Sequence, residues 1–272
     1  MRTAIVVFTK VPKAGETKTR LTTSRGGVLT PEEAEFLYTA CLLDVINCCV
    51  ASQSGDVWIC YNCEGDREYL NKVLTRTNDP ARIKGIYCDR GGTFDECMQY
   101  AADYLLENSS ERLAEAVVIV GGDLPGLQPS IIKEAVKKLK CMAVSEAGLA
   151  AIKGQGEAVG AAVVEGACQE GGFSLIGYTY TTPFKFDQVF YNLEGITALD
   201  MVVDKVEASQ IPFAFVEMVP DVDIPVDLAS MIPVVKGIKL AAAYDSTVLA
   251  PMNILRMLEE LGLAASALPP QR

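Results

Sequence analysis

AVVIVGGDLP, residues 116–125, is the stretch that decides the fold class. Its first half, residues 116–120, is short, apolar and rich in β-branched side chains, which is typical of a strand buried on both faces. Gly121 and Gly122 then allow a turn and a close approach of a ligand to the backbone. Asp123 follows just past the carboxyl end of this predicted strand. Open α/β sheets bind ligands at that edge, so Asp123 is a candidate functional residue.

Strands and helices alternate through the first half of the chain. Apolar strands are predicted at residues 4–9, 57–61, 83–88 and 116–120, and a helix follows each of them. Thr30-Pro31-Glu32-Glu33 and Thr93-Phe94-Asp95-Glu96 have the pattern of capping boxes that open two of these helices. Four successive βα units predict an α/β fold, with a mostly parallel central sheet and helices on both faces.

The second half of the chain is less regular. Residues 141–158 are rich in Gly and Ala, and we expect an inserted loop or hairpin there. Strands are predicted at 161–164, 173–178 and 212–219, and helices at 197–208 and 251–261. We therefore expect one domain over residues 1–235, with an insertion at about 141–158, and a C-terminal helical tail over residues 236–272.

The composition excludes several classes of function. The formal net charge is −11 and the sequence pI is about 4.6, so nucleic acid and anionic membranes are not expected as partners. The chain has no histidine, which rules out Ser-His-Asp and Cys-His catalysis and histidine metal sites. Catalysis must then rely mainly on carboxylates, Lys, Arg, Tyr and Cys.

The cysteines and the chain start indicate a cytoplasmic protein. Nine cysteines include the pair Cys60 and Cys63, a CxxC without a second ligand pair, so we expect reduced and mostly buried thiols that bind no metal. The N-terminal apolar run is too short for a signal peptide, and no membrane-spanning stretch is expected.

A basic loop follows the first predicted strand. Lys10, Lys13, Lys18 and Arg20 lie close together in an acidic chain, and Gly15 permits a tight turn between them. A local cluster of this kind indicates a phosphate-binding loop, although the Walker pattern is absent. The alternative is an ordinary solvated basic loop.

Two further motifs carry chemistry. Asp221 and Asp223, two residues apart on an extended segment, would point the same way and could share a hard divalent cation with Asp123. The alternative for this pair is a turn held by Asx hydrogen bonds. Glu170-Gly171-Gly172 precedes another strand and fits either a close approach to a ligand or a plain loop.

Taken in order, these motifs resemble one family. KTRL (18–21), GGDLPGLQP (121–129), EGGFSLIG (170–177) and DVDIPVDL (221–228) are similar to motifs of the transferase-1, DUF2064-type proteins. These are nucleotide-diphospho-sugar transferases with a GT-A-like fold, and some are called arsenosugar-biosynthesis glycosyltransferases. The resemblance covers roughly residues 3–235, apart from residues 141–158.

The resemblance implies roles for matching positions. Gly15, Lys18 and Arg20, with Lys10 and Gly122 beside them, would hold the phosphates of the nucleotide. Asp123, Asp221 and Asp223 would bind Mg²⁺ or Mn²⁺, and Asp123 and Glu170 would be the catalytic candidates, with Glu170 as acceptor base.

Three stretches depart from the family pattern, one of them Gly195-Ile196-Thr197, where the family has W-S-T. Glu170 replaces the Asp of the family's DGG motif, while Thr93 and Cys97 stand in a stretch that has D-L-G-x-R-M in the family, which removes its Arg. These departures bear on the acceptor side and on turnover.

Three functions compete. The first is metal-dependent transfer of a glycosyl group from a nucleotide-diphosphate sugar to a small-molecule acceptor. The alternative is a nucleotidyltransferase that joins a nucleoside triphosphate to a phosphorylated small molecule and releases pyrophosphate, because the KTRL loop also resembles that of phospholactate guanylyltransferases. The third is a nucleotide-binding relative without catalytic activity, and fold alone does not choose among them.

Overall fold

The computed structural model describes residues 1–107, 112–152 and 157–265. In these residues one seven-stranded sheet forms the middle layer. Its strands are β1 (Thr3–Thr9), β2 (Asp56–Tyr61), β3 (Ile83–Cys88), β4 (Ala116–Gly121), β5 (Val163–Ala167), β6 (Phe173–Thr179) and β7 (Phe213–Val216).

The strand order is β3-β2-β1-β4-β6-β5-β7. β3, β2, β1 and β4 are parallel to one another, and β5 and β7 are parallel to each other. β6 is antiparallel to both of its neighbours, β4 and β5. The sheet is therefore mostly parallel, and the predicted α/β architecture with four leading βα units is confirmed.

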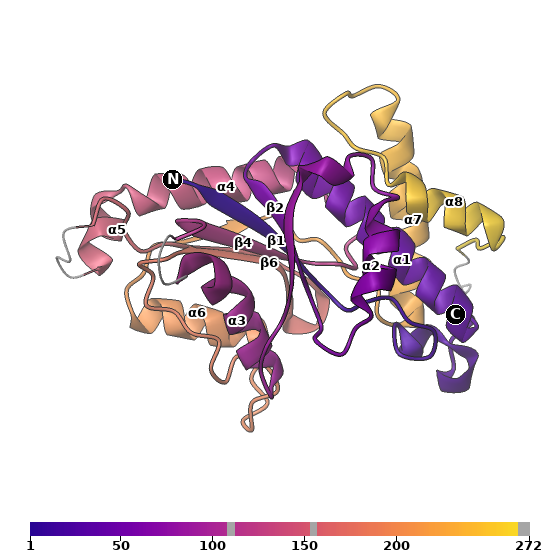
Figure 1. Cartoon of the computed structure of the whole chain (residues 1–272), viewed down its shortest axis with the longest axis horizontal. Coiled ribbons are helices and arrows are strands. Elements are labelled where there is room, and N and C mark those ends of the chain that lie inside the picture. The colour runs from indigo at the N-terminus through magenta and orange to yellow at the C-terminus, as the bar shows by residue number, and fades with distance from the viewer. Residues whose placement is uncertain (108–111, 153–156, 266–272) are drawn as a thin grey trace, which may run out of the picture.

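Helices cover both faces of the sheet (Figure 1). α1, α2 and α4 pack on one face, through a core that includes Leu42, Leu70 and Ile132. α3 and α6 pack on the other face, through a core that includes Leu105 and Val202. The bounds are α1 (Pro31–Ser52), α2 (Arg67–Leu74), α3 (Phe94–Leu106), α4 (Pro129–Ala143), α5 (Glu146–Ala151), α6 (Ala198–Ala208), α7 (Pro225–Ala242) and α8 (Met252–Glu260).

Both predicted capping boxes are present. The side chains of Thr30 and Thr93 accept hydrogen bonds from the backbone N–H groups of Glu33 and Glu96, and each glutamate bonds back to the cap residue. These contacts fix where α1 and α3 begin, and α3 brings Phe94 to the carboxyl edge of the sheet.

The expectation of a loop or hairpin at residues 141–158 is wrong at 141–143 and 146–151, which are helical. α4 continues to Ala143 and α5 occupies Glu146–Ala151, opened by the side chain of Ser145, which accepts a hydrogen bond from the N–H of Gly148. Small residues were read as loop formers, although Ala favours helices. Residues 153–156 lie outside the described residues.

The C-terminal helices belong to the body of the molecule. α7 runs continuously through the predicted domain end at residue 235, and the Val235 side chain is buried. α7, α8 and the N-terminal half of α1 share a third core that includes Leu37, Ile232 and Ile254. Residues 266–272 of the expected tail lie outside the described residues.

α1 corrects another expectation. By length and composition this 22-residue helix could cross a membrane, whereas no such stretch was expected. However, 78% of its most apolar window is buried within the protein, as in a core helix. The apolar side chains of α1 pack into two cores, the one against the sheet and the one shared with α7 and α8. This packing explains the apolar character of the helix.

All nine cysteines are free thiols. Cys41, Cys48, Cys49, Cys60 and Cys168 are buried as expected, whereas Cys63 and Cys141 are exposed. Burial raises the pKa of Cys168 to about 12, which keeps this thiol protonated at neutral pH.

Candidate functional site

A cavity of about 500 Å³ opens at the carboxyl ends of the parallel strands. Each of the four parallel strands β3, β2, β1 and β4 contributes a residue that follows it: Asp89, Asn62, Lys10 and Asp123. Asp221 and Asp223, from the segment between β7 and α7, also line this cavity. The sheet edge predicted from Asp123 is therefore where these candidate residues meet.

Lys18 stands at the centre of this constellation. Its Nζ donates to Asp123 Oδ2 at 2.6 Å and to Asp223 Oδ1 at 2.5 Å. The Lys18 side chain is only 6% exposed, and its backbone is left-handed, with φ of 50°. That conformation is unfavourable for a residue with a side chain, so the contacts of the ammonium group must hold it in place. We expected Gly15, Lys18, Asp123 and Asp223 to converge on one cleft; this is confirmed for Lys18, Asp123 and Asp223 and wrong for Gly15.

The electrostatics of the cluster follow from this geometry. Burial would lower the pKa of Lys18, but the carboxylates of Asp123 and Asp223 outweigh it and raise that pKa, so the lysine stays charged. Burial, together with the negative charges of Asp123 and Asp223, raises the pKa of Asp221 to about 6. Three carboxylates thus lie close to the ammonium group of Lys18, and Arg20 adds a second cation 3.8 Å from Asp223.

Two polar side chains position the aspartates. Asp227, in the first turn of α7, accepts hydrogen bonds from the backbone N–H groups of Asp223 and Ile224 at 3.0 and 2.9 Å. Gln169 donates to the backbone carbonyl of Asp221 at 3.0 Å and accepts from its N–H at 3.3 Å. Val222 points the other way into the third core, so the extended pair faces the cavity as its spacing predicts.

The basic loop divides into two parts. Lys10, Lys18 and Arg20 line the cavity, and Arg20 lies 3.8 Å from Asp223. Lys13 instead pairs with Glu16 at the surface. Gly15 has φ of 80° and forms the predicted turn, but it does not line the cavity.

The glycines beside Asp123 serve the protein's own packing. A Cβ on Gly122 would lie 2.9 Å from Thr9 Oγ1 and 3.2 Å from Leu42 Cδ1. A Cβ on Gly121 would lie 2.9 Å from a carboxylate oxygen of Asp123. Both glycines also line the cavity, as the expected approach of a ligand needs. The internal contacts are a second reason for a small residue at these positions.

Glu170 is not brought to the cavity. The residue is exposed, has φ of 59°, and lines neither this cavity nor the neighbouring one described below. Its place is the turn before β6, whereas Phe173 of β6 does line the cavity. The structure thus gives no contact that supports Glu170 as the acceptor base.

Sequence reasoning missed several polar residues of the site, among them Tyr38, Asn62 and Asp89. The Tyr38 hydroxyl bonds Thr9 Oγ1 at 2.7 Å, and the Tyr38 ring lies 5.5 Å from Lys18 Nζ. Asn62 accepts from the backbone N–H of Val11 at 2.7 Å, and Asp89 accepts from that of Cys63 at 2.8 Å. The position of Asn62 and Asp89 just past predicted strands could have flagged them, whereas Tyr38 is hidden in an apolar helix.

The aspartates fit a hard cation. Oxygens of Asp123 and Asp223 both lie within 2.6 Å of one point, which the Lys18 ammonium group occupies, and Asp221 lies close enough for their charges to raise its pKa. As the side chains stand, however, no group of three or more His, Cys, Asp or Glu within the described ranges could hold a metal ion. A divalent ion would therefore require the ammonium of Lys18 to move away.

Comparison with solved structures shows the fold family of the chain. The chain has the nucleotide-diphospho-sugar transferase fold: it is similar over 96% of its length to a protein of Desulfovibrio desulfuricans G20 that is provisionally named as such a transferase, with 21% identity, a TM-score of 0.69 and 97% of that chain covered. A cytidylyltransferase from Leptospira borgpetersenii is more distant, at 12% identity and a TM-score of 0.47, with 96% and 95% coverage.

The chain belongs to the family described as "Uncharacterized protein conserved in bacteria (DUF2064)", whose profile matches residues 45–193. A further structure, glucosyl-3-phosphoglycerate synthase from Mycobacterium tuberculosis with Mn²⁺, UDP and glucosyl-3-phosphoglycerate, has 11% identity and a TM-score of 0.39, with 97% and 82% coverage. No curated protein sequence matches the chain.

Proposed function

We propose that this protein is a cytoplasmic, metal-dependent glycosyltransferase that uses a nucleotide-diphosphate sugar. The observation that carries the proposal is the meeting of Lys18, Asp123 and Asp223 at the carboxyl edge of the sheet, with contacts of 2.6 and 2.5 Å. This arrangement supplies a cation that could bind phosphate oxygens and two carboxylates that could bind Mg²⁺ or Mn²⁺. A bound divalent ion would stabilise the negative charge that develops on the leaving diphosphate.

The residues of the cavity would have different roles in binding. Arg20 can bind phosphate oxygens with two parallel hydrogen bonds, while Lys10 and Lys18 act as point charges. Once the ammonium group of Lys18 turns toward the phosphates, the oxygens of Asp123 and Asp223 become available to the metal. Asp227 and Gln169 hold the backbone of the two later aspartates in place throughout.

A nucleotidyltransferase remains the second candidate. Lys10, Lys18 and Arg20 all line one cavity, and a triphosphate whose pyrophosphate is released also requires several cations. The two candidates differ in their products, because the first releases a nucleoside diphosphate and the second releases pyrophosphate. A purely nucleotide-binding role would give neither.

The test has two stages. Thermal unfolding with a panel of nucleoside triphosphates and nucleotide sugars, with and without Mn²⁺, identifies the donor, because a ligand of the folded state raises the midpoint. The identified donor is then assayed with candidate acceptors for nucleoside diphosphate and for pyrophosphate. Asp123→Asn should abolish metal-dependent nucleotide binding and keep the fold, and unchanged dependence on Mn²⁺ in that variant would contradict the proposal.

A further inference from the structure

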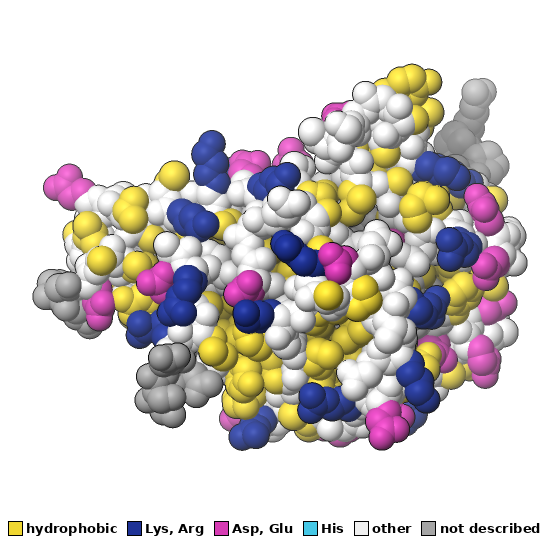
Figure 2. Space-filling model, turned by 45° about the horizontal axis from the view of Figure 1, so that its top comes forward, with side chains coloured by type: hydrophobic (Ala, Val, Ile, Leu, Met, Phe, Trp, Pro, Cys, Tyr) yellow, Lys and Arg dark blue, Asp and Glu magenta, His cyan; other side chains and the backbone are white. Residues whose placement is uncertain are grey.

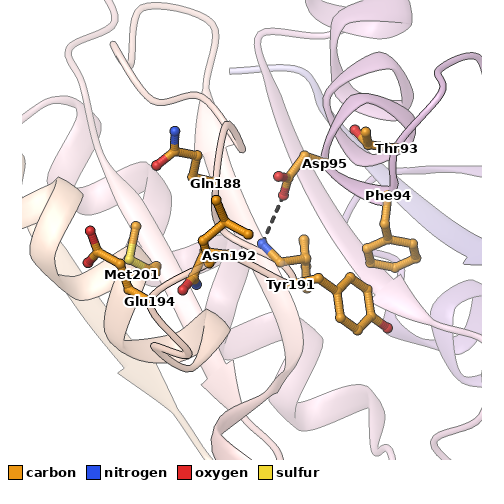
Figure 3. Close-up of a pocket in the computed structure, with 10 residues that line it drawn as sticks. Thr93, Phe94, Asp95, Gln188, Tyr191, Asn192, Glu194 and Met201 are labelled. Carbon is orange, nitrogen blue, oxygen red and sulfur yellow. Dashed lines mark hydrogen bonds between the residues drawn. The ribbon is translucent and has the colours of Figure 1, made fainter.

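A second cavity, of about 610 Å³, adjoins the first. It lies between the first turn of α3 and the 188–194 loop that follows β6, with Met201 of α6 at its far side (Figure 3). Phe94 and Tyr191 line both cavities. A molecule in the second cavity would therefore be next to whatever occupies the first.

The shared wall of the two cavities is aromatic. Phe94 packs edge-on against Phe190, with ring centroids 4.6 Å apart, and lies 6.3 Å from Tyr191. Phe8 and Phe173, which line the first cavity, contact Phe94 and Phe190 respectively. The ring faces offer a ligand a flat apolar surface.

Tyr191 is strongly exposed and has an unfavourable backbone conformation. Its side chain is 90% exposed and its backbone φ is 53°, and Gln188 in the same loop has φ of 59°. The ring contacts Phe94 on one side and is otherwise free to contact a ligand in this cavity. Leu193 beside it is also fully exposed.

The charged side chains described in the lining of this cavity are both acidic. Asp95 and Glu194 line it, and among the described residues that do so none is Lys or Arg. One oxygen of Asp95 accepts a hydrogen bond from the backbone N–H of Phe190 at 2.9 Å, which ties α3 to the loop (Figure 3). Two carboxylates without a cation would repel a phosphate or carboxylate group.

We infer that the second cavity binds the acceptor, and that this acceptor is a neutral or cationic molecule with an apolar ring face, not a phosphorylated one. This assignment rests on the proposed function, since it places the acceptor beside the donor cavity. It also separates the two candidate reactions, because the nucleotidyltransferase would need a phosphorylated partner in a cavity with two carboxylates.

Three probes of one shape and different charge test the inference. Tyramine is cationic, tyrosol is neutral and 4-hydroxyphenylacetate is anionic, and binding of each to the whole protein is measured by ligand-observed NMR with and without UDP and Mn²⁺. We expect tyramine to bind most tightly and 4-hydroxyphenylacetate least, by about tenfold or more. Equal affinities, or tighter binding of the anion, would overturn the inference.

Matched variants locate the binding. Tyr191→Ala should weaken tyramine binding threefold to tenfold, whereas Tyr244→Ala, which removes a tyrosine that is 88% exposed elsewhere, should have no effect. Glu194→Gln should reduce the preference for tyramine over tyrosol. Equal effects of the two tyrosine variants would overturn the assignment of the cavity.

The proposed function is tested apart from this inference. UDP and other nucleotides report on the first cavity alone, so a failure of nucleotide binding with the expected order of the three probes would remove the transferase and leave the ring-binding cavity. If nucleotides bind but the three probes do not bind in the expected order, the transferase proposal stands and the ring-binding cavity is removed.

Discussion

At the scale of single residues, Lys18 decides how the site works. Its ammonium group takes the position between Asp123 and Asp223 that a metal ion would need. In the proposed function, the same group would bind phosphate oxygens of the nucleotide. Binding of metal and binding of nucleotide are therefore expected to be coupled through one side chain.

Lys18→Met tests this competition. Without nucleotide, the variant should bind Mn²⁺ about tenfold more tightly than the parent protein, because the charged group that competes for the carboxylate oxygens is gone, and tenfold corresponds to about 1.4 kcal/mol, the size of a charge-assisted hydrogen bond. Free Mn²⁺ measured by electron paramagnetic resonance gives the affinities. Lys13→Met is the control, since Lys13 pairs with Glu16 at the surface. Unchanged affinity in Lys18→Met would show that the lysine does not exclude the ion.

Glu165 on β5 is a second residue with a measurable effect. It is fully buried, and within the described part of the chain neither carboxyl oxygen has a hydrogen-bond partner. Burial raises its pKa to about 8. The folded protein therefore keeps a proton that the unfolded chain releases near pH 4.5, so stability falls as the pH rises between these two values.

Glu165→Gln removes this titration. Compared with the variant, the parent protein should lose up to about 1.4 kcal/mol of unfolding free energy per pH unit between pH 5 and 8. Urea denaturation at several pH values measures both proteins. Parallel stability curves would mean that Glu165 is ionised in the folded state.

At the scale of elements, α8 is held to α1 by a buried carboxylate. Asp44 of α1 accepts hydrogen bonds from the backbone N–H groups of Asn253 and Ile254 and from the Asn253 side chain, at 3.1, 2.9 and 2.7 Å. Burial raises the pKa of Asp44, and these three hydrogen bonds oppose the rise. The negative charge also suits the N-terminus of a helix.

Asp44→Ala should lower the free energy of unfolding by about 1–3 kcal/mol, because the first N–H groups of α8 lose their partner. Asp204→Ala, at an exposed position of α6, is the control and should change stability little. Hydrogen exchange across residues 251–260 would show whether α8 opens first. An equal loss in both variants would contradict this role of Asp44.

At the scale of the whole molecule, the negative net charge opposes the binding of an anionic ligand at the site. The net charge of −11 repels an anionic nucleotide. On the face shown in Figure 2, basic and acidic side chains are interspersed, so this face carries no large field of one sign. We therefore expect attraction to come from the few cations that line the cavity at the carboxyl edge of the sheet.

Arg20→Ala should weaken nucleotide binding by about 1.5–3 kcal/mol, the range for hydrogen bonds to charged groups. Lys13→Ala should have little effect, although it removes the same charge from the same loop, because Lys13 does not line the cavity. Isothermal titration with the donor compares the two variants. Equal losses would indicate that the overall charge, not the local contact, governs binding.

The sequence by itself determined the local structure and the sheet edge. Alternating strand and helix patterns, the Thr30 and Thr93 caps, and Asp123 after the strand at residues 116–120 predicted the parallel sheet and the place of the site, because these signals depend on neighbouring residues. The spacing of Asp221 and Asp223 likewise predicted that both face one way.

Only the tertiary structure decided which distant residues meet. Lys18 lies 105 residues from Asp123 and 205 from Asp223, and no local pattern shows that its ammonium group would stand between them. The same holds for Tyr191 beside Phe94 and for Asp44 under α8. It also holds for Glu170, which the family resemblance made a candidate base but which the turn before β6 keeps away from the cavity. Such contacts depend on packing between elements, and local propensities do not encode it.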